Sequence, residues 1–244
     1  MNTTNYLSHL SVDNVIFGYH NKQLKVLLTK LYNNDMWMLP GGFIKDTESI
    51  LDAAKRVACE RTGLKDLYLK QYKSYGEPKR TFDTNITVNE EYYFDGKKSD
   101  IINDYFVSIS FYTLTEFSKV NITKSEIDQD CQWFNLEEVP ELLYDHSIIF
   151  EDAVKALRFH VDYFPIGMKL LGNKFTMPEI QSLYETILDK KIDRRNFSKK
   201  ILKSGILIKL DEQRKIGAHR SPNLYSFNVE NYTKALESGV GSFF

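Results

Sequence analysis

The stretch from Gly42 to Leu64, GFIKDTESILDAAKRVACERTGL, decides the fold predicted for the first half of this 244-residue chain. From Thr47 onward its apolar residues recur at helical spacing, which predicts one amphipathic helix that Gly63 ends. Two apolar runs precede the stretch, at residues 12–19 and 24–31. The short polar segment between these runs predicts a strand–turn–strand unit. The sequence therefore favours an α/β domain.

The same stretch fits a pattern usually written G-x5-E-x7-R-E-U-x-E-E-x-G-U, in which U is aliphatic. The residues that fall at its specified positions are Gly42, Glu48, Arg56, Glu60, Gly63 and Leu64. This pattern is the Nudix box, and over about residues 8–160 the chain resembles the Nudix family. The resemblance implies a Nudix-like α/β/α sandwich with a mixed sheet.

Three positions of the predicted helix decide whether such a domain cleaves its ligand. Carboxylates at these positions lie on one helix face and converge on a divalent cation that activates water. Here the positions hold Val57, Glu60 and Arg61. One glutamate is a poor anchor for a hard cation, and Arg61 is expected to repel the ion or to take its place by pairing with Glu60. We therefore expect no metal, no cofactor and no catalytic residue. Under the alternative, Glu90, Glu91 or Asp128 would supply the ligands that rebuild a metal site.

The remaining polar residues of the box have two interpretations. Glu48 and Arg56 either pair to hold the loop before the helix, or they line a pocket that binds a polar ligand without cleaving it. Trp37 either borders such a pocket or serves only core or rim packing of the domain. Asp145 either reaches the pocket or caps the next helix. The predicted ligand-binding residues are Lys30, Trp37, Gly42, Glu48, Arg56, Glu60, Asp145 and His146.

Charge is divided unevenly along the chain. Residues 165–244 hold 14 Lys and Arg against 8 Asp and Glu, whereas the rest holds 18 against 25, for a net charge of −1. Such a division predicts two modules with different partners. No apolar run approaches the ~20 residues that a bilayer span needs, and the first ten residues lack the features of a secretory signal. With Cys59 and Cys131 as its two cysteines, the chain is expected to be cytoplasmic.

The predicted domains are residues 1–164, which end in a connector helix, and residues 165–244. Ser147 is the expected N-cap of the connector, and Pro165 its stop. Beyond it the sequence predicts a helix at 176–188 capped by Thr176, a helix at 193–205 capped by Asp193, and a two-stranded hairpin at 206–228. This order is typical of a winged helix-turn-helix domain.

The helix at 193–205 divides its residues by face. Phe197, Ile201 and Leu202 are expected to pack inward, while basic and amide side chains point outward. A run of charge is usually only a solvated face, but Arg and Asn can bind base edges and Lys and Ser can bind phosphates. A basic hairpin tip suits a wing. The predicted DNA-binding residues are Arg194, Arg195, Asn196, Ser198, Lys199, Lys200, Lys203, Arg214, Lys215, His219 and Arg220.

A degenerate Nudix domain followed by a basic winged helix resembles the NrtR-like family of transcriptional regulators. The segments AAKRV, QSLYE and RNFSKK, and the DH before the connector helix, are similar to those of its AraR-like subgroup. The resemblance implies a homodimer that binds a palindromic double-stranded DNA operator and responds to a small molecule. That effector is ADP-ribose or a related nucleotide in some members and L-arabinose in others. The expectation for this chain is a sugar such as L-arabinose, although a polar segment at 76–104 departs from the relatives.

Two other functions stay open at this point. A Nudix pyrophosphohydrolase acting on ADP-ribose or a related nucleotide would use the basic C-terminal region to grip its substrate. Val57 and Arg61 argue against this alternative because they remove metal ligands. A protein-interaction module would show no salt-dependent DNA binding.

Overall fold

The structure, a computed structural model, describes residues 6–32, 35–78, 80, 107–124, 128–214 and 221–239. The chain forms two compact units. Met1–Tyr19 with Leu24–Val154 make the first, and His20–Gln23 with Lys155–Phe244 make the second. The division falls inside helix α2 (His146–Tyr163), and the predicted domain boundary after residue 164 stays a prediction. Most of the polar segment at 76–104 lies outside the described residues.

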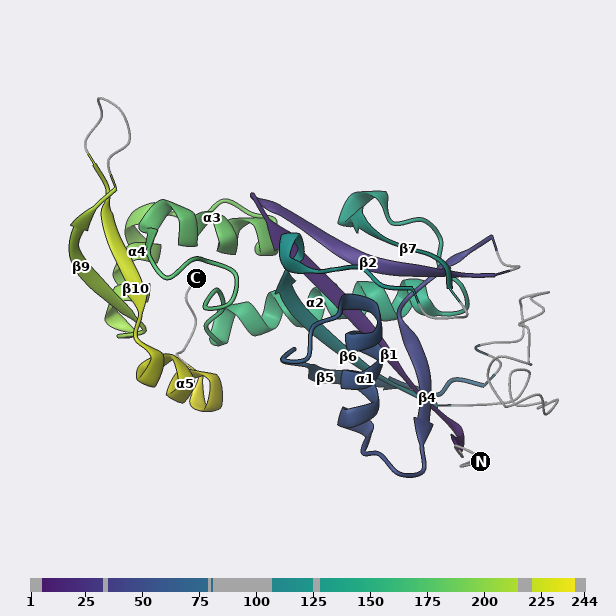
Figure 1. Cartoon of the computed structure of the whole chain (residues 1–244). Helices are drawn as coiled ribbons and strands as arrows, with labels where there is room; N and C mark the ends of the chain where they lie inside the picture. The colour runs from purple at the N-terminus through teal and green to yellow at the C-terminus, as the bar shows by residue number, and fades with distance from the viewer. Residues whose placement is uncertain are drawn as a thin grey trace. The chain divides into compact units, whose positions relative to one another are not determined.

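The first unit is built on a seven-stranded mixed sheet (Figure 1). Its strands are β1 (Tyr6–His20), β2 (Gln23–Leu31), β3 (Trp37–Met38), β4 (Gly41–Lys45), β5 (Lys70–Tyr75), β6 (Val107–Glu116) and β7 (Asp128–Asn135). Two 3-10 turns, η3 (Phe117–Lys119) and η4 (Leu136–Glu138), follow β6 and β7. β1 is parallel to β6, whereas β1–β4, β2–β3, β2–β7 and β5–β6 are antiparallel pairs.

Helix α1 (Ile50–Thr62) covers one face of this sheet. Its N-cap is Ser49, and Gly63, at φ +69°, ends it by donating its N–H to Cys59 O at 2.8 Å. The side chain of Asn14 on β1 donates to Ala54 O on α1 at 3.0 Å. The predicted helix and its stop at Gly63 are confirmed.

The beginning of α2 covers the opposite face. Successive residues of a strand point to opposite faces, and whereas Asn14 contacts α1, its neighbour Asp13 lies beside His146, the first residue of α2. The first unit is therefore the α/β/α sandwich with a mixed sheet that the sequence predicts (Figure 1). The predicted N-cap role of Ser147 is wrong, because α2 begins one residue before Ser147, at His146, and the Ser147 hydroxyl accepts from Leu142 N at 3.0 Å.

The second unit has the winged-helix order. It contains β8 (Phe175–Thr176), α3 (Met177–Leu188), α4 (Arg194–Lys203), β9 (Leu207–Gln213), β10 (Asn223–Phe227) and α5 (Val229–Ser238). The strands form a three-stranded sheet in the order β8-β10-β9. The predicted helix–turn–helix–hairpin is confirmed, and α5 is an additional helix that the sequence analysis missed. Among the described residues, no helix combines the length and hydrophobicity that a membrane crossing needs.

Helices α3 and α4 begin at their predicted caps. Thr176 forms a capping box with Glu179 at the start of α3, and the Asp193 carboxylate accepts from Asn196 N at 2.8 Å at the start of α4. Phe197 and Ile201 are fully buried against α3, as expected. Leu202 is not, since 42% of it is exposed. It lies about 100° around the helix from its neighbour, off the buried stripe.

Loss of the cap on α4 should destabilise the second unit. Asp193→Ala leaves the first-turn N–H groups of α4 without a side-chain acceptor, which costs about 1 kcal/mol of unfolding free energy. Asp193→Asn keeps an acceptor and is expected to unfold like the wild type. Urea unfolding of the full chain measures both variants, and equal losses in the two would show that the cap does not act through its hydrogen bond.

Candidate functional sites

Glu48 and Arg56 of the Nudix-like motif form a staple between α1 and the preceding loop. Arg56 donates to the two Glu48 carboxylate oxygens at 3.0 and 2.7 Å and to Phe43 O at 2.9 Å. Glu48 also accepts from Lys45 N at 2.9 Å. Burial alone would raise the pKa of Glu48, but the hydrogen bonds from Arg56 and Lys45 hold that pKa below its usual value. Of the two interpretations, the loop-holding pair is present, and a contact with a ligand stays a prediction.

Val57 occupies one of the three metal-ligand positions and lies in the core. It is 1% exposed and packs among the aliphatic residues between α1 and the sheet. A Cβ placed on Gly42 would lie 2.9 Å from Val57 Cγ2. Gly42 therefore serves the close approach of β4 to α1, and it lies in a strand rather than at a turn. An alkyl group fills the space where a carboxylate would face a cation.

Arg61 fills the third metal-ligand position with a buried guanidinium. Its Nε lies 2.9 Å from Asp128 Oδ2, and its Nη2 donates to Asp128 Oδ1 at 3.3 Å. Both residues are buried, at 3% and 1% exposure. The partner expected from the sequence, Glu60, is the looser one, with 3.7 Å between Nη1 and Oε2. Asp128, a candidate metal ligand, is thus committed to an arginine.

The described residues of the motif do not fit a divalent cation. Within the described ranges no group of three or more His, Cys, Asp or Glu side chains is arranged to hold a metal ion. Glu60, the surviving carboxylate, is 3.4 Å from Arg56 and 3.7 Å from Arg61, so two cations already neutralise it. Two candidate ligands, Glu90 and Glu91, lie outside the described residues.

Asp145 and His146 belong to a buried polar cluster with Asp13 and Arg80. Arg80 donates to both Asp145 carboxylate oxygens, at 2.8 and 2.6 Å, and its Nη2 lies 3.9 Å from Asp13 Oδ2. Ser108 donates to the same Asp13 oxygen. The Asp145 carboxylate therefore binds Arg80, while its backbone oxygen accepts from Ile148 N and Ile149 N of α2. Asp13 and Arg80 had no motif to mark them, since one lies in an apolar strand and the other in a polar run.

His146 is held neutral in this cluster. Its Nδ1 accepts from Leu39 N at 3.0 Å, which leaves the proton on Nε2, 3.6 Å from Asp13 Oδ1. Burial lowers the pKa of the imidazole, although the charges of Asp13 and Asp145 oppose the shift. A neutral imidazole thus bridges the β3–β4 segment and the first turn of α2.

The stability of the chain should fall as pH drops below the ordinary histidine pKa of 6.5. Below that pH the unfolded state binds a proton at His146 that the folded state does not bind. The free energy of unfolding should therefore fall by up to about 1.4 kcal/mol per pH unit. His146→Asn removes this titration and keeps an acceptor for Leu39. Urea unfolding between pH 5 and 7 compares the two proteins. Parallel curves would contradict a neutral His146.

Lys30 and Trp37 are paired neighbours on β2 and β3. Lys30 makes an ion pair of 3.4 Å with the exposed Asp35, and the Trp37 ring meets Phe134 edge to face at 4.8 Å. Trp37 O accepts from Leu143 N at 2.8 Å, two residues before Asp145. The chain from Trp37 to Lys45 thus passes the His146 cluster at Leu39 and reaches the Arg56 staple at Phe43. It links the two groups of predicted ligand-binding residues.

The outward face of α4 is basic, as predicted. Arg194, Arg195, Asn196, Lys199, Lys200 and Lys203 are exposed, and Ser198 is half-buried. Arg214 differs, because it forms an ion pair with Glu179 and donates to Lys174 O at 3.1 Å. It fastens the hairpin to the start of α3, and a DNA contact by Arg214 stays a prediction. Lys215, His219 and Arg220 lie outside the described residues.

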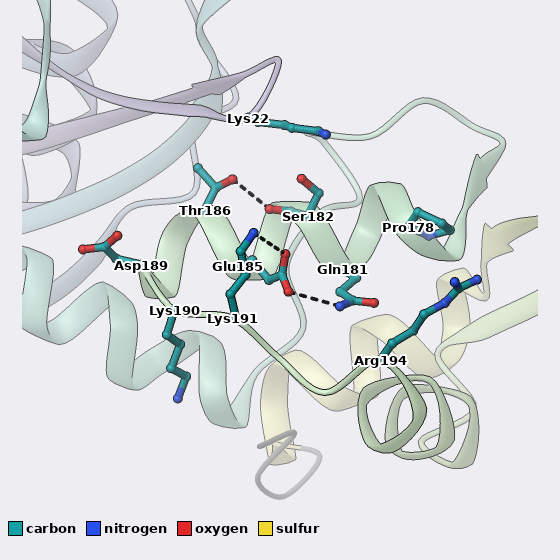
Figure 2. Close-up of a pocket in the computed structure, with 10 residues that line it drawn as sticks. All are labelled: Lys22, Pro178, Gln181, Ser182, Glu185, Thr186, Asp189, Lys190, Lys191 and Arg194. Atoms are coloured by element: carbon teal, nitrogen blue, oxygen red, sulfur yellow. Dashed lines mark hydrogen bonds and ion pairs between the residues drawn. The ribbon is translucent and has the colours of Figure 1, made fainter.

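A pocket of about 620 Å³ lies along α3 in the second unit (Figure 2). Its lining residues are Lys22, Pro178, Gln181, Ser182, Glu185, Thr186, Asp189, Lys190, Lys191 and Arg194. The Glu185 carboxylate accepts from Gln181 Nε2 at 3.1 Å and from Ile192 N at 3.0 Å, so it fixes the α3–α4 turn. Of the predicted DNA-binding residues, Arg194 lines this pocket.

Comparisons with known proteins agree with this architecture. Residues 7–153 match the NUDIX domain family, and residues 167–227 match the NrtR DNA-binding winged helix domain. The chain is 27% identical, over 91% of its own length and 83% of the relative's, to the "ADPR responsive transcriptional repressor NtrR" of Acinetobacter baylyi.

Solved structures resemble this chain over most of its length. The crystal structure of Shewanella oneidensis NrtR complexed with a 27mer DNA is 27% identical, with a TM-score of 0.70 over 92% of this chain and 95% of that one. A MutT/nudix family protein from Enterococcus faecalis, 21% identical, shares the fold, with a TM-score of 0.66 over 92% and 88% of the two chains. The chain therefore belongs to the Nudix family, and its Nudix domain is followed by a winged-helix domain of the NrtR type.

Proposed function

We propose that this protein is a transcriptional repressor that binds an operator through α4 and releases it in response to a small molecule held by the Nudix domain. The observation that carries the proposal is the outward basic face of α4, in a chain whose Nudix helix has Val57 and the Arg61–Asp128 pair at its metal positions. Such a regulator works in the cytoplasm, where its DNA is.

The chemistry of α4 suits double-stranded DNA. Arg195 and Asn196 carry the donor and acceptor groups that bind guanine and adenine edges, and the lysines bind phosphates. Arg194 and Arg195 lie in the first turn of α4, the part of a recognition helix that enters the major groove. A homodimer with two such helices would bind a palindromic operator with half-sites about 10 base pairs apart.

For the effector, ADP-ribose replaces the sugar expected from the sequence. The relative from Acinetobacter baylyi is named for its response to ADPR, whereas no observation on this chain supports L-arabinose. Arg56 and Lys30, whose side chains are 24% and 21% exposed, carry charges that bind a diphosphate and gain little from a neutral pentose. The AraR-like subgroup assignment stays a prediction for the same reason.

The effector is bound and not cleaved. Hydrolysis would need a cation to neutralise the pyrophosphate and to activate water, and Val57 and Arg61 take two of its ligand positions. A sensor gains from this loss, since an effector that is cleaved ends the signal. A coupling free energy of about 1–3 kcal/mol between effector and operator would change operator affinity about 5- to 150-fold.

A gel-shift titration on the DNA upstream of the protein's own gene tests this function. We expect a specific complex that weakens steeply as salt rises, and that ADP-ribose weakens about 5- to 150-fold while L-arabinose leaves it unchanged. Absence of any specific complex would contradict the DNA-binding function. A response to L-arabinose instead of ADP-ribose would contradict the effector. Rapid turnover of ADP-ribose with magnesium would favour the pyrophosphohydrolase.

A further inference from the structure

Helix α2 is one continuous helix whose two halves are held by different units. The division between the units falls between Val154 and Lys155. In the first half, Ile149 O accepts from the Tyr72 hydroxyl at 2.8 Å, and the Asp152 carboxylate accepts from Lys73 at 2.7 Å. Tyr72 and Lys73 lie on β5, so the first half of α2 is bound to the sheet of the Nudix domain.

The second half of α2 is joined to the C-terminus of α3 by Arg158. Its Nε donates to Ile187 O at 3.1 Å, and its Nη2 lies 3.4 Å from the Asp189 carboxylate. Asp189 ends α3 in the left-handed conformation, at φ +53°. The last carbonyl groups of a helix have no partner within it and carry a partial negative charge. A guanidinium that binds one of them fixes the end of α3 to α2.

Helix α5 ties the chain after α2 to the end of α4. The Tyr232 hydroxyl donates to Pro165 O at 3.1 Å, and the Asn231 amide donates to Gly205 O at 2.9 Å. Gly205 follows α4 at φ +73°, and a Cβ there would lie 3.2 Å from Asn231 Nδ2. The segment at Pro165, where the sequence places the domain boundary, is therefore fastened rather than left as a hinge.

We propose that Arg158 is a positioning residue for the effector response of operator binding, because it makes the second half of α2 part of the DNA-binding unit. Because α2 is continuous, a movement of its first turn at Asp145 and His146 is passed through Arg158 to α3 and from there to α4. This inference rests on the proposed function and assigns its coupling to a named residue. A purely stabilising cap would instead alter unfolding and leave the effector response unchanged.

Hydrogen exchange of the full chain tests the placement of Arg158 without any effector. In Arg158→Ala, amides of residues 155–163 and 185–190 should exchange about 2- to 5-fold faster, the size expected from losing a contact at a helix terminus, while residues 146–154 keep the wild-type rate. Lys234→Ala is the matched control, because it removes one positive charge from an exposed pair with Glu230 in the same unit. Unchanged exchange at 185–190 in Arg158→Ala would overturn the proposal.

Operator titrations with and without ADP-ribose test the coupling. We expect the effector-free affinity of Arg158→Ala to stay within about 3-fold of the wild type and the ADP-ribose effect to fall below about 2-fold. Arg158→Lys keeps the charge but not the two-atom contact, and should retain an intermediate effect. A full effector response in Arg158→Ala would overturn the coupling. If the wild type ignores ADP-ribose, the proposed effector fails, and the exchange experiment alone decides the placement of Arg158.

Discussion

Replacing Arg195 and Lys199 together with alanine is expected to weaken operator binding about 30- to 1000-fold. An arginine bound to a base edge contributes about 1–3 kcal/mol, and a lysine bound to a phosphate adds to it. Both side chains are exposed on α4, so DNA can reach them without unfolding the domain. The slope of log affinity against log salt should also fall by about 0.9 for each phosphate contact removed.

Two controls separate this effect from a loss of structure. Phe197 and Ile201, which are fully buried, hold α4 in place. The double variant should therefore have the same urea midpoint of unfolding as the wild type. Lys234→Ala removes a charge on α5 and should bind the operator normally. Binding of the double variant within about 3-fold of the wild type would show that α4 is a solvated charged face and not a recognition helix.

Arg61→Met should have the largest effect on stability. It leaves the Asp128 carboxylate, 1% exposed, without its closest cation, and removing one partner of a buried ion pair costs about 3–5 kcal/mol. Urea unfolding of the full chain measures the loss. Lys30→Met, which breaks the exposed pair with Asp35, is the control and should shift the midpoint little.

A double variant shows whether the pair itself carries the effect. Arg61→Met with Asp128→Leu replaces the two charges by apolar groups, which is often nearly neutral in a buried site. We therefore expect the double variant to recover most of the stability lost by Arg61→Met, so that the two substitutions are strongly non-additive. Additive losses would mean that Arg61 and Asp128 act independently, and that the arginine does not stand in for a cation.

Most of the fold could be predicted from local patterns in the sequence. Apolar spacing and the stop at Gly63 define α1, and the cap signals at Thr176 and Asp193 define α3 and α4. The prediction that Leu202 packs inward was wrong because Leu202 is the residue next to Ile201 and lies just outside the buried stripe of α4. Ser147 was misassigned because its hydroxyl serves Leu142, a contact that a cap motif does not show.

The sites were less predictable because their pairings span long stretches of chain. Asp128 lies 67 residues after Arg61 and Asp145 lies 65 residues after Arg80, so no spacing rule connects them. The two members of the Glu48–Arg56 staple lie 8 residues apart within one motif, and that pair was foreseen as one alternative. The identity of the effector is harder still to predict from the sequence. It depends on how the pocket groups face a ligand rather than on which residue types are present.

Recovery of the effector after it has acted is the most direct measurement of the central claim, that the Nudix domain recognises ADP-ribose and leaves it whole. The protein–operator complex is incubated with ADP-ribose and manganese until the DNA is released, and the nucleotide is then analysed by mass spectrometry. The account predicts that all of the ADP-ribose is recovered intact while the operator is free. Conversion to AMP and ribose 5-phosphate in step with operator release would contradict it.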